Sequence, residues 1–253
     1  MPLTEERKYM TKKRADILLL EKGLCESREQ AKRLILAGKV RAGKDRVIQK
    51  SSEEFTDDTE FILEETIPYV SRGAYKLLPA LEKYLPALDG MTALDIGAST
   101  GGFTDLMLQR GAMKVYAVDV GTAQLHQKLR ENPKVVSIEN VNARYLDGTH
   151  IPGMTDVLTM DVSFISATKI LPSVNPFLKD GSFAFILVKP QFEAGRAEVG
   201  KGGVVKDEGV RMRCVDEIAK FAELQLNWKK MDVMASPLLG PKGNQEYILV
   251  FRK

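Results

Sequence analysis

The chain has 253 residues, of which 44% are hydrophobic and 28% charged, a composition that is ordinary for a globular protein. No apolar stretch approaches the roughly 20 residues that span a bilayer, and the N-terminus lacks a secretory signal, so we expect a cytoplasmic protein with no membrane partner. Two distant cysteines, and two histidines with no cysteine nearby, indicate neither a disulfide framework nor a metal site.

The formal net charge of +3 is unevenly distributed along the chain. Residues 1–50 hold 14 lysines and arginines against 7 acidic residues, a net charge of +7. The remainder holds 23 basic and 27 acidic residues, a net charge of −4. Such asymmetry is typical of a basic module that binds a polyanion.

The basic segment predicts two short helices and a hairpin. The first helix covers residues 15–22 and ends at Gly23, and the second begins at Ser27, where Gln30 completes a capping box. Residues 39–48, KVRAGKDRVI, alternate around a glycine turn and predict a hairpin. The polar, acidic residues 51–61 either complete a strand of this module or form the linker, and we place the domain boundary between residues 62 and 63.

Over about residues 11–57 this pattern resembles the S-four type of RNA-binding domain. The matching residues are Arg14, Asp16, Leu19, Gly23 and the run SREQAKRLILAGKV. In that family the two helices present basic residues to structured RNA. The phosphate contacts that we predict are Arg14, Arg28, Lys32 and Arg33. Two alternatives remain: the charged helix faces are simply solvated, or Arg33 pairs with Glu29 one turn earlier.

From residue 92 onward, apolar strands alternate with helical patterns, which predicts a doubly wound, mostly parallel α/β sheet. The predicted strands are residues 92–96, 114–118, 135–138, 157–160, 183–188, 228–234 and 247–251. The strand at 183–188 is apolar throughout, as expected for a strand covered on both faces, and Pro190 cannot continue it. Lys189 therefore lies at a carboxyl end, where such sheets place their ligands.

A glycine-rich loop, GASTGG at residues 97–102, follows the first strand of this sheet. Its glycines permit close approach of the backbone to a ligand, but their spacing does not match the dinucleotide fingerprint. Asp95 disfavours a pyrophosphate and suits the cationic amine and sulfonium of S-adenosylmethionine. Asp119, at the end of the second strand, is placed to accept hydrogen bonds from ribose hydroxyls. The alternative is a glycine turn and two strand-end acids without a cofactor.

Four more polar residues lie at helix starts or strand ends: Lys76, Asp161, Lys189 and Glu246. They can converge at one sheet edge, and they resemble the Lys-Asp-Lys-Glu tetrad of FtsJ-like RNA ribose 2′-O-methyltransferases. The chain further resembles the TlyA, or hemolysin A, family, which joins an S-four domain to an FtsJ-like domain. Its motifs are VSRGAYKL, LDIGASTGGFTD, DVSFIS, LVKPQFEAG, KGGVVKD and GNQEY. Ala74 departs from this family, which usually has a second glycine there.

The resemblance implies a Rossmann-like class I methyltransferase domain at residues 63–253. It implies S-adenosylmethionine-dependent methylation of cytidine ribose in ribosomal RNA, with ribosomal RNA or subunits as partners and no obligatory protein partner. Lys189 then deprotonates and aligns the hydroxyl, Asp161 orients it, and Lys76 and Glu246 serve the ribose and the charge network. The predicted cofactor contacts are Ser71, Asp95, Gly97, Ser99, Gly101, Gly102, Phe103, Asp119, Asn142 and Asp161.

The segment at residues 192–207, FEAGRAEVGKGGVVKD, follows the tetrad lysine. Its glycines and the basic Arg196, Lys201 and Lys206 predict a mobile loop that orders over RNA, the alternative being a solvated surface loop. Two competing functions are a non-catalytic RNA-binding factor on a methyltransferase fold and a membrane-active haemolysin. The intact tetrad argues against the first, and the lack of an amphipathic or apolar insertion segment argues against the second.

Overall fold

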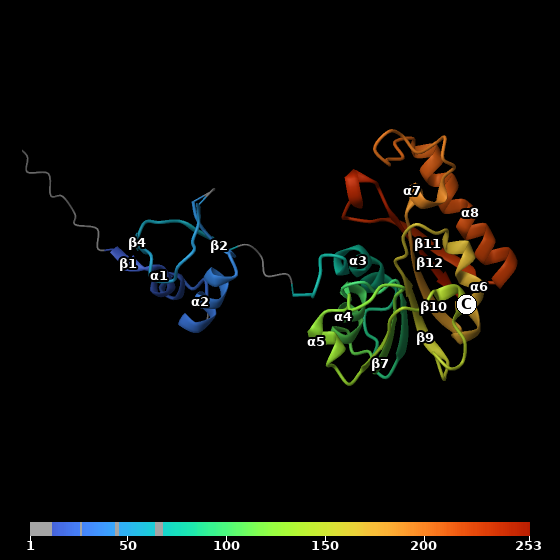
Figure 1. The fold of residues 1–253 in the computed structure, drawn as a ribbon, viewed down its shortest axis with the longest axis horizontal. Helices are drawn as coiled ribbons and strands as arrows, with labels where there is room; N and C mark the ends of the chain where they lie inside the picture. Colours follow the sequence, from blue (N-terminus) through green and yellow to red (C-terminus); the bar gives the residue numbers. More distant parts are fainter. Residues whose placement is uncertain (1–11, 26, 44–45, 64–67) are drawn as a thin grey trace, which may run out of the picture. The chain divides into compact units, whose positions relative to one another are not determined.

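The computed structural model describes residues 12–25, 27–43, 46–63 and 68–253. The chain forms two compact units, Met1–Pro68 and Tyr69–Lys253, both drawn in Figure 1. The second unit begins at Tyr69, six residues after the domain start predicted at residue 63.

The N-terminal unit is a small α+β module. It contains β1 (Lys12–Arg14), α1 (Ala15–Glu21), α2 (Arg28–Leu36), β2 (Val40–Ala42), β3 (Arg46–Val47), β4 (Glu54–Thr56) and β5 (Phe61–Leu63). Strand β1 pairs antiparallel with β4, and β2 pairs antiparallel with both β3 and β5. The predicted hairpin is therefore confirmed, although residues 44–45 of its turn lie outside the described residues. The acidic segment at 51–61 supplies β4 and the start of β5, so it belongs to this module.

Local sequence signals set the ends of its two helices. Gly23 follows α1 in the left-handed region, with φ of +69°. The Ser27 hydroxyl accepts the backbone N–H of Gln30 at 3.2 Å, which is the N-cap expected at the start of α2. Apolar side chains of both helices and of the strands then close over one small core, which includes Leu18, Leu19, Ala31, Ile35, Val40 and Ile48.

The C-terminal unit is built on a seven-stranded sheet of order β11-β12-β10-β9-β6-β7-β8. Strands β6 (Thr92–Ile96), β7 (Lys114–Val118), β8 (Val135–Ile138), β9 (Thr155–Met160) and β10 (Leu178–Val188) run parallel. Strand β12 (Tyr247–Arg252) is antiparallel to its neighbours β10 and β11 (Lys229–Ala235). The mostly parallel sheet predicted from the sequence is therefore confirmed.

Strand β10 is the element that differs most from its prediction, since it starts at Leu178 rather than at residue 183. Its first half, LKDGS, is too polar to be recognised by hydropathy. This half is nevertheless extended because Leu178 pairs with Thr155 of β9, and the N–H of Gly181 donates to the carbonyl of Lys253 at 2.7 Å.

Helices cover both faces of this sheet. They are α3 (Ala74–Tyr84), α4 (Gly102–Gln109), α5 (Gln127–Arg130), α6 (Leu171–Val174), α7 (Pro190–Glu193) and α8 (Glu208–Leu226), with short 3-10 turns at Ala143–Tyr145, Ala167–Lys169, Asn175–Phe177 and Pro241–Gly243. Helices α3 and α4 pack on one face, and α6 and α8 pack on the other (Figure 1). In β10 the side chains alternate accordingly: Phe185 packs towards α3 and α4, and Ile186 packs towards α6 and α8.

The carboxyl ends of the parallel strands β6–β10 lie at one edge of the sheet. The chain runs outward from β6 to β7 and β8, and then returns to β9 on the other side of β6. Parallel sheets bind ligands where the order reverses in this way, outside the carboxyl ends of the strands. Separately, no helix among residues 12–25, 27–43, 46–63 and 68–253 is both long and apolar enough to cross a bilayer.

Candidate active site

Two neighbouring cavities lie at the carboxyl edge of the sheet, with volumes of about 520 Å³ and about 140 Å³. Gly97, Ser99 and Asp161 line both of them, so the two cavities meet at the ends of β6 and β9. The larger also contacts Asp119 and Asn142. Among the predicted cofactor residues, the smaller cavity alone is lined by Ser71, Asp95, Gly102 and Phe103. Gly101 lines neither cavity; it precedes α4 with φ of +94°.

Two glycines permit the close approach of the loops around these cavities. Gly97 has φ of +79°, and a Cβ there would collide with the backbone carbonyl of Asp161. A Cβ on Gly102 would lie 2.5 Å from the Ser71 hydroxyl and 2.9 Å from the backbone nitrogen of Ala74. Any side chain at either position would push β9 or the start of α3 away from the glycine-rich loop.

The carboxylate of Asp119 is fixed by the backbone of the surrounding loops. It accepts the N–H of Ser99 at 2.8 Å on one oxygen and the N–H of Gly121 at 2.7 Å on the other. Each oxygen keeps a second acceptor site, so hydroxyl groups in the larger cavity can still donate to it. Asn142, also on this cavity, accepts the backbone N–H of Arg144 at 3.1 Å and begins a 3-10 turn.

Asp95 is fully buried beneath the smaller cavity. Its two oxygens accept hydrogen bonds from the hydroxyls of Thr104 at 2.6 Å and Thr159 at 2.8 Å. Burial raises the pKa of this carboxyl to about 6, although the threonine hydrogen bonds act in the opposite direction. Asp95 therefore lines the smaller cavity with both oxygens hydrogen-bonded to threonine hydroxyls, and its charge changes around pH 6.

The first charged pair of the site joins the ends of β9 and β10. Lys189 Nζ lies 2.5 Å from Asp161 Oδ1 and donates to the Ser163 hydroxyl at 2.9 Å. The lysine side chain is 10% exposed and the aspartate 22%. Asp161 Oδ1 is therefore paired with the lysine ammonium, and Asp161 lines both cavities.

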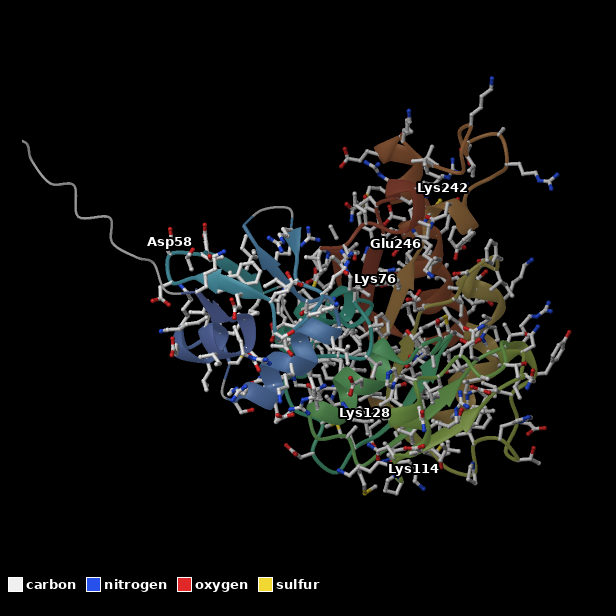
Figure 2. The ribbon with its side chains drawn as sticks, turned by 60° about the vertical axis from the view of Figure 1, so that its left-hand side comes forward. Asp58, Lys76, Lys114, Lys128, Lys242 and Glu246 are labelled. Carbon is white, nitrogen blue, oxygen red and sulfur yellow. The ribbon has the colours of Figure 1, made fainter. Side chains whose placement is uncertain are left out.

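The second charged pair joins α3 to the residue before β12. Lys76 Nζ donates to Glu246 Oε2 at 2.6 Å, and Figure 2 shows the two side chains together. Glu246 is fully buried and its second oxygen is 3.4 Å from the amide nitrogen of Gln191. The four residues predicted as a tetrad thus form two ion pairs, each linking segments that are distant in sequence.

Three residues of the site were not among the predicted ones. Ser163 is in the DVSFIS motif, and its spacing from Asp161 is the only signal that points to it. Gln191 follows the Lys-Pro pair and has no distinctive signal. Phe164 lines the larger cavity, is 89% exposed, and has φ of +64°, a strained conformation for a bulky residue. Its ring lies 4.7 Å from that of Phe192.

The segment predicted as a mobile loop is held at several points in the structure. Glu198 forms an ion pair with Arg213 of α8 and accepts the backbone N–H of Gly195 at 3.1 Å. Gly200 and Val204 form an antiparallel bridge. Arg196 and Lys201 remain exposed on this segment.

In the N-terminal unit, two of the predicted phosphate contacts share one buried acid. Asp16 is fully buried and accepts hydrogen bonds from Arg14 at 2.9 Å and from Arg28 at 3.0 Å. The hydrogen bond from Arg14 is the main reason that the pKa of Asp16 is lowered. The two arginine side chains stay 40% and 49% exposed, so their outer N–H groups are open. Asp16 thus holds two guanidinium groups, from β1 and α2, close together.

The other two predicted contacts lie further along α2. Lys32 pairs with Glu29 at 2.7 Å, so the partner that the sequence allowed for Arg33 is held by Lys32 instead. Arg33 is exposed. No group of three or more histidine, cysteine or acidic residues lies together as metal ligands would in the described ranges, and both cysteines are buried free thiols.

We expect the two arginines beside Asp16 to carry salt-sensitive RNA affinity. Arg14→Ala combined with Arg28→Ala should reduce the slope of log affinity against log salt by about two, because each lost phosphate contact removes about one unit. Filter binding to ribosomal RNA at several salt concentrations measures this. Arg110→Ala, which removes a partly exposed guanidinium paired with Glu82 on the other unit, is the control. An unchanged slope in the double variant would show that this face does not bind RNA.

Both units of the chain match known protein families. The family model of FtsJ-like methyltransferases matches residues 69–253, and that of the S4 domain, the S-four type above, matches residues 13–49. The 16S/23S rRNA (cytidine-2′-O)-methyltransferase TlyA of Mycobacterium tuberculosis is 45% identical over 94% of this chain and 89% of its own length. Hemolysin A of Brachyspira hyodysenteriae is 41% identical over 94% of this chain and 99% of its own length.

A solved structure from Streptococcus thermophilus, described as a candidate hemolysin, is 42% identical, covers 96% of this chain and 89% of that one, and superposes with a TM-score of 0.72. The identities and coverage are high across both units. This chain belongs to the TlyA, or hemolysin A, family, in which an S4 domain is joined to an FtsJ-like methyltransferase domain.

Proposed function

We propose that this protein transfers the methyl group of S-adenosylmethionine to the ribose 2′-hydroxyl of a cytidine in ribosomal RNA. The observation that carries this proposal is the pair of buried ion pairs, Lys189–Asp161 and Lys76–Glu246, at a sheet edge that also holds a two-part cavity. The M. tuberculosis relative is named for this reaction. A non-catalytic RNA-binding factor would have no need for two largely buried ion pairs beside an open cavity.

The residues around the cavities fit the donor. The larger cavity offers Asp119 and Asn142 to a ribose and a base, and the smaller offers acidic groups to a cation. Asp95 and Asp161 both line the smaller cavity, and the Asp161 carboxylate is shared with Lys189. When bound, S-adenosylmethionine supplies a methyl group that its sulfonium has already activated.

The protein's own residues then act on the acceptor hydroxyl. Lys189 receives the proton of the 2′-hydroxyl as the neutral amine, while the hydroxyl oxygen takes the methyl group from the sulfonium, and Asp161 and Ser163 fix the direction of the amine. Lys76 holds the ribose from the α3 side, and the fully buried Glu246 holds the amine of Lys76. Because the methyl group is already activated, alignment of the hydroxyl contributes more to the rate than strong basicity does.

Two further features support an RNA substrate. The open ring of Phe164 at the larger cavity can stack against an unpaired nucleobase. The S-four unit provides paired guanidinium groups for phosphates.

The charge of Asp95 gives a pH test of the cofactor site. Its pKa of about 6 in the folded protein lies above the ordinary value of 3.8. A cationic ligand binds better to the ionised form, so we expect S-adenosylmethionine affinity to fall as the pH falls through 6. Calorimetry at several pH values should show this for the wild type and not for Asp95→Asn.

The raised pKa of Asp95 also makes the free energy of unfolding depend on pH. Between pH 6 and pH 4 the folded state binds the Asp95 proton more strongly than the unfolded state does, so this residue's contribution rises as the pH falls. The unfolding free energy of the wild type minus that of Asp95→Asn should therefore rise as the pH falls from 6 to 4. If cofactor affinity had the same pH profile in the wild type and in Asp95→Asn, the proposed role of Asp95 in binding S-adenosylmethionine would be contradicted.

The direct test of the proposed function is methylation of purified ribosomal subunits with labelled S-adenosylmethionine, followed by mass spectrometry of the nucleosides. We expect 2′-O-methylcytidine as the labelled product. Label on a base, or none at all, would overturn the proposal.

The names of two relatives suggest membrane lysis as a second function. Leakage of dye from phospholipid vesicles at micromolar protein distinguishes the two functions, and we expect none.

A further inference from the structure

One buried amide connects two loops beside the active site. Asn244 is 2% exposed and lies two residues before Glu246. Its Nδ2 donates to the carbonyl of Gly203 at 2.9 Å and to that of Pro241 at 3.1 Å, and its Oδ1 accepts the N–H of Val205 at 3.1 Å. The Asn244 side chain therefore connects the loop at residues 195–206 to the turn at residues 236–244.

These two loops carry cations that have no acidic partner. They are Arg196, Lys201, Lys206 and Lys242, all exposed, and none forms an ion pair within the described ranges. By contrast, Lys83, Arg110 and Lys179 of the same unit each pair with a carboxylate. The charge on the two loops is thus available to a polyanion.

The loops approach each other beside the second ion pair. A Cβ on Gly203 would lie only 3.6 Å from Lys242 Nζ, so the Lys242 side chain extends to the loop at residues 195–206. Figure 2 shows Lys242, Glu246 and Lys76 in one region of the C-terminal unit. Lys242 and the Gly203 end of the 195–206 loop therefore lie in the region of a predicted catalytic pair on the C-terminal unit.

We propose that Asn244 is a positioning residue that locks the two loops into one basic rim, formed by Arg196, Lys201, Lys206 and Lys242, on which the phosphates flanking the target nucleotide lie. This inference rests on the proposed function, because the polyanion is taken to be the RNA substrate. Holding the cations in place before RNA arrives lowers the ordering cost of binding.

The variant Asn244→Asp tests the lock. Its carboxylate keeps the acceptor for Val205 but cannot donate to Gly203 or Pro241. We expect tryptic cleavage at residues 196, 201 and 206 to accelerate by about tenfold, because the loops open more often. The KM for ribosomal subunits should rise by about tenfold, a change in phosphate contact rather than chemistry. We expect kcat and S-adenosylmethionine affinity to stay nearly unchanged.

The control is Asn132→Asp, which adds the same charge to the same unit. The Asn132 side chain accepts the N–H of Lys134 at 2.9 Å in a turn away from both loops, so both the tryptic rate and KM should match the wild type. A tryptic rate for Asn244→Asp equal to that of Asn132→Asp would overturn the lock.

A second variant tests the rim without disturbing the buried amide. Lys201→Ala with Lys242→Ala changes two exposed side chains, and we expect the salt slope of RNA binding to fall by about two. An unchanged slope would overturn the rim. Failure of the proposed function is distinguishable, since wild-type protein would then transfer no methyl group, whereas proteolysis and RNA binding would still decide this inference.

Discussion

Replacing Lys189 with alanine should reduce methyl transfer by at least about 100-fold, the lower range for loss of a general acid–base group. Lys189 is 8% exposed and is held by Asp161 and Ser163 at the carboxyl end of β10. Cofactor binding should persist, because the residues predicted to hold the donor lie mainly around β6, β7 and β8. Single-turnover methylation of ribosomal subunits with both substrates saturating measures the chemical step.

Lys179→Ala is the matched control for this prediction. Lys179 lies on the same strand and also pairs with an aspartate, Asp156, at 2.6 Å, but it is half exposed and far along the strand from the site. We expect its rate to be that of the wild type. A Lys189→Ala rate within a few-fold of wild type would make Lys189 a structural cap of β10 and would refute the catalytic assignment.

The architecture was predictable where hydrophobic periodicity and turn chemistry agreed. The runs at 92–96 and 114–118 have the same bounds in the sheet, because short apolar strands bounded by polar residues have few other conformations. The start of β10 was not predictable, since LKDGS is polar and is extended only through pairing with β9 and Lys253. Tertiary pairing decided this boundary, and no local signal reports it.

The candidate site was predictable in its residue types but not in its pairing. Polar residues at strand ends pointed to Asp161, Lys189 and Glu246. The sequence could not show that Lys189 pairs with Asp161 while Lys76 pairs with Glu246, because each pair depends on how distant segments pack. The hydrogen bonds that the buried Asp95 accepts from two threonine hydroxyls were hidden for the same reason.

The Lys76–Glu246 pair is expected to combine a structural and a functional role, which a double-mutant cycle can separate. Lys76→Met leaves a fully buried carboxylate, and Glu246→Gln leaves an amine that is 14% exposed. Removing one partner of a buried pair typically costs about 3–5 kcal/mol, whereas replacing both is close to neutral. We expect Lys76→Met to be the more destabilising single change, since Glu246 has no access to water.

The double variant should regain most of the lost stability and none of the lost methyl transfer. Urea unfolding followed by the fluorescence of Trp228, the only tryptophan and part of the C-terminal unit, measures the stability of the relevant unit. The control cycle uses Lys83→Met and Asp232→Asn, an exposed pair that also begins on α3, for which the coupling should stay below about 1 kcal/mol. Recovery of both stability and rate in the Lys76→Met, Glu246→Gln protein would show that this pair only holds α3 against the sheet, because a group that binds the ribose cannot be replaced by a thioether without loss of rate.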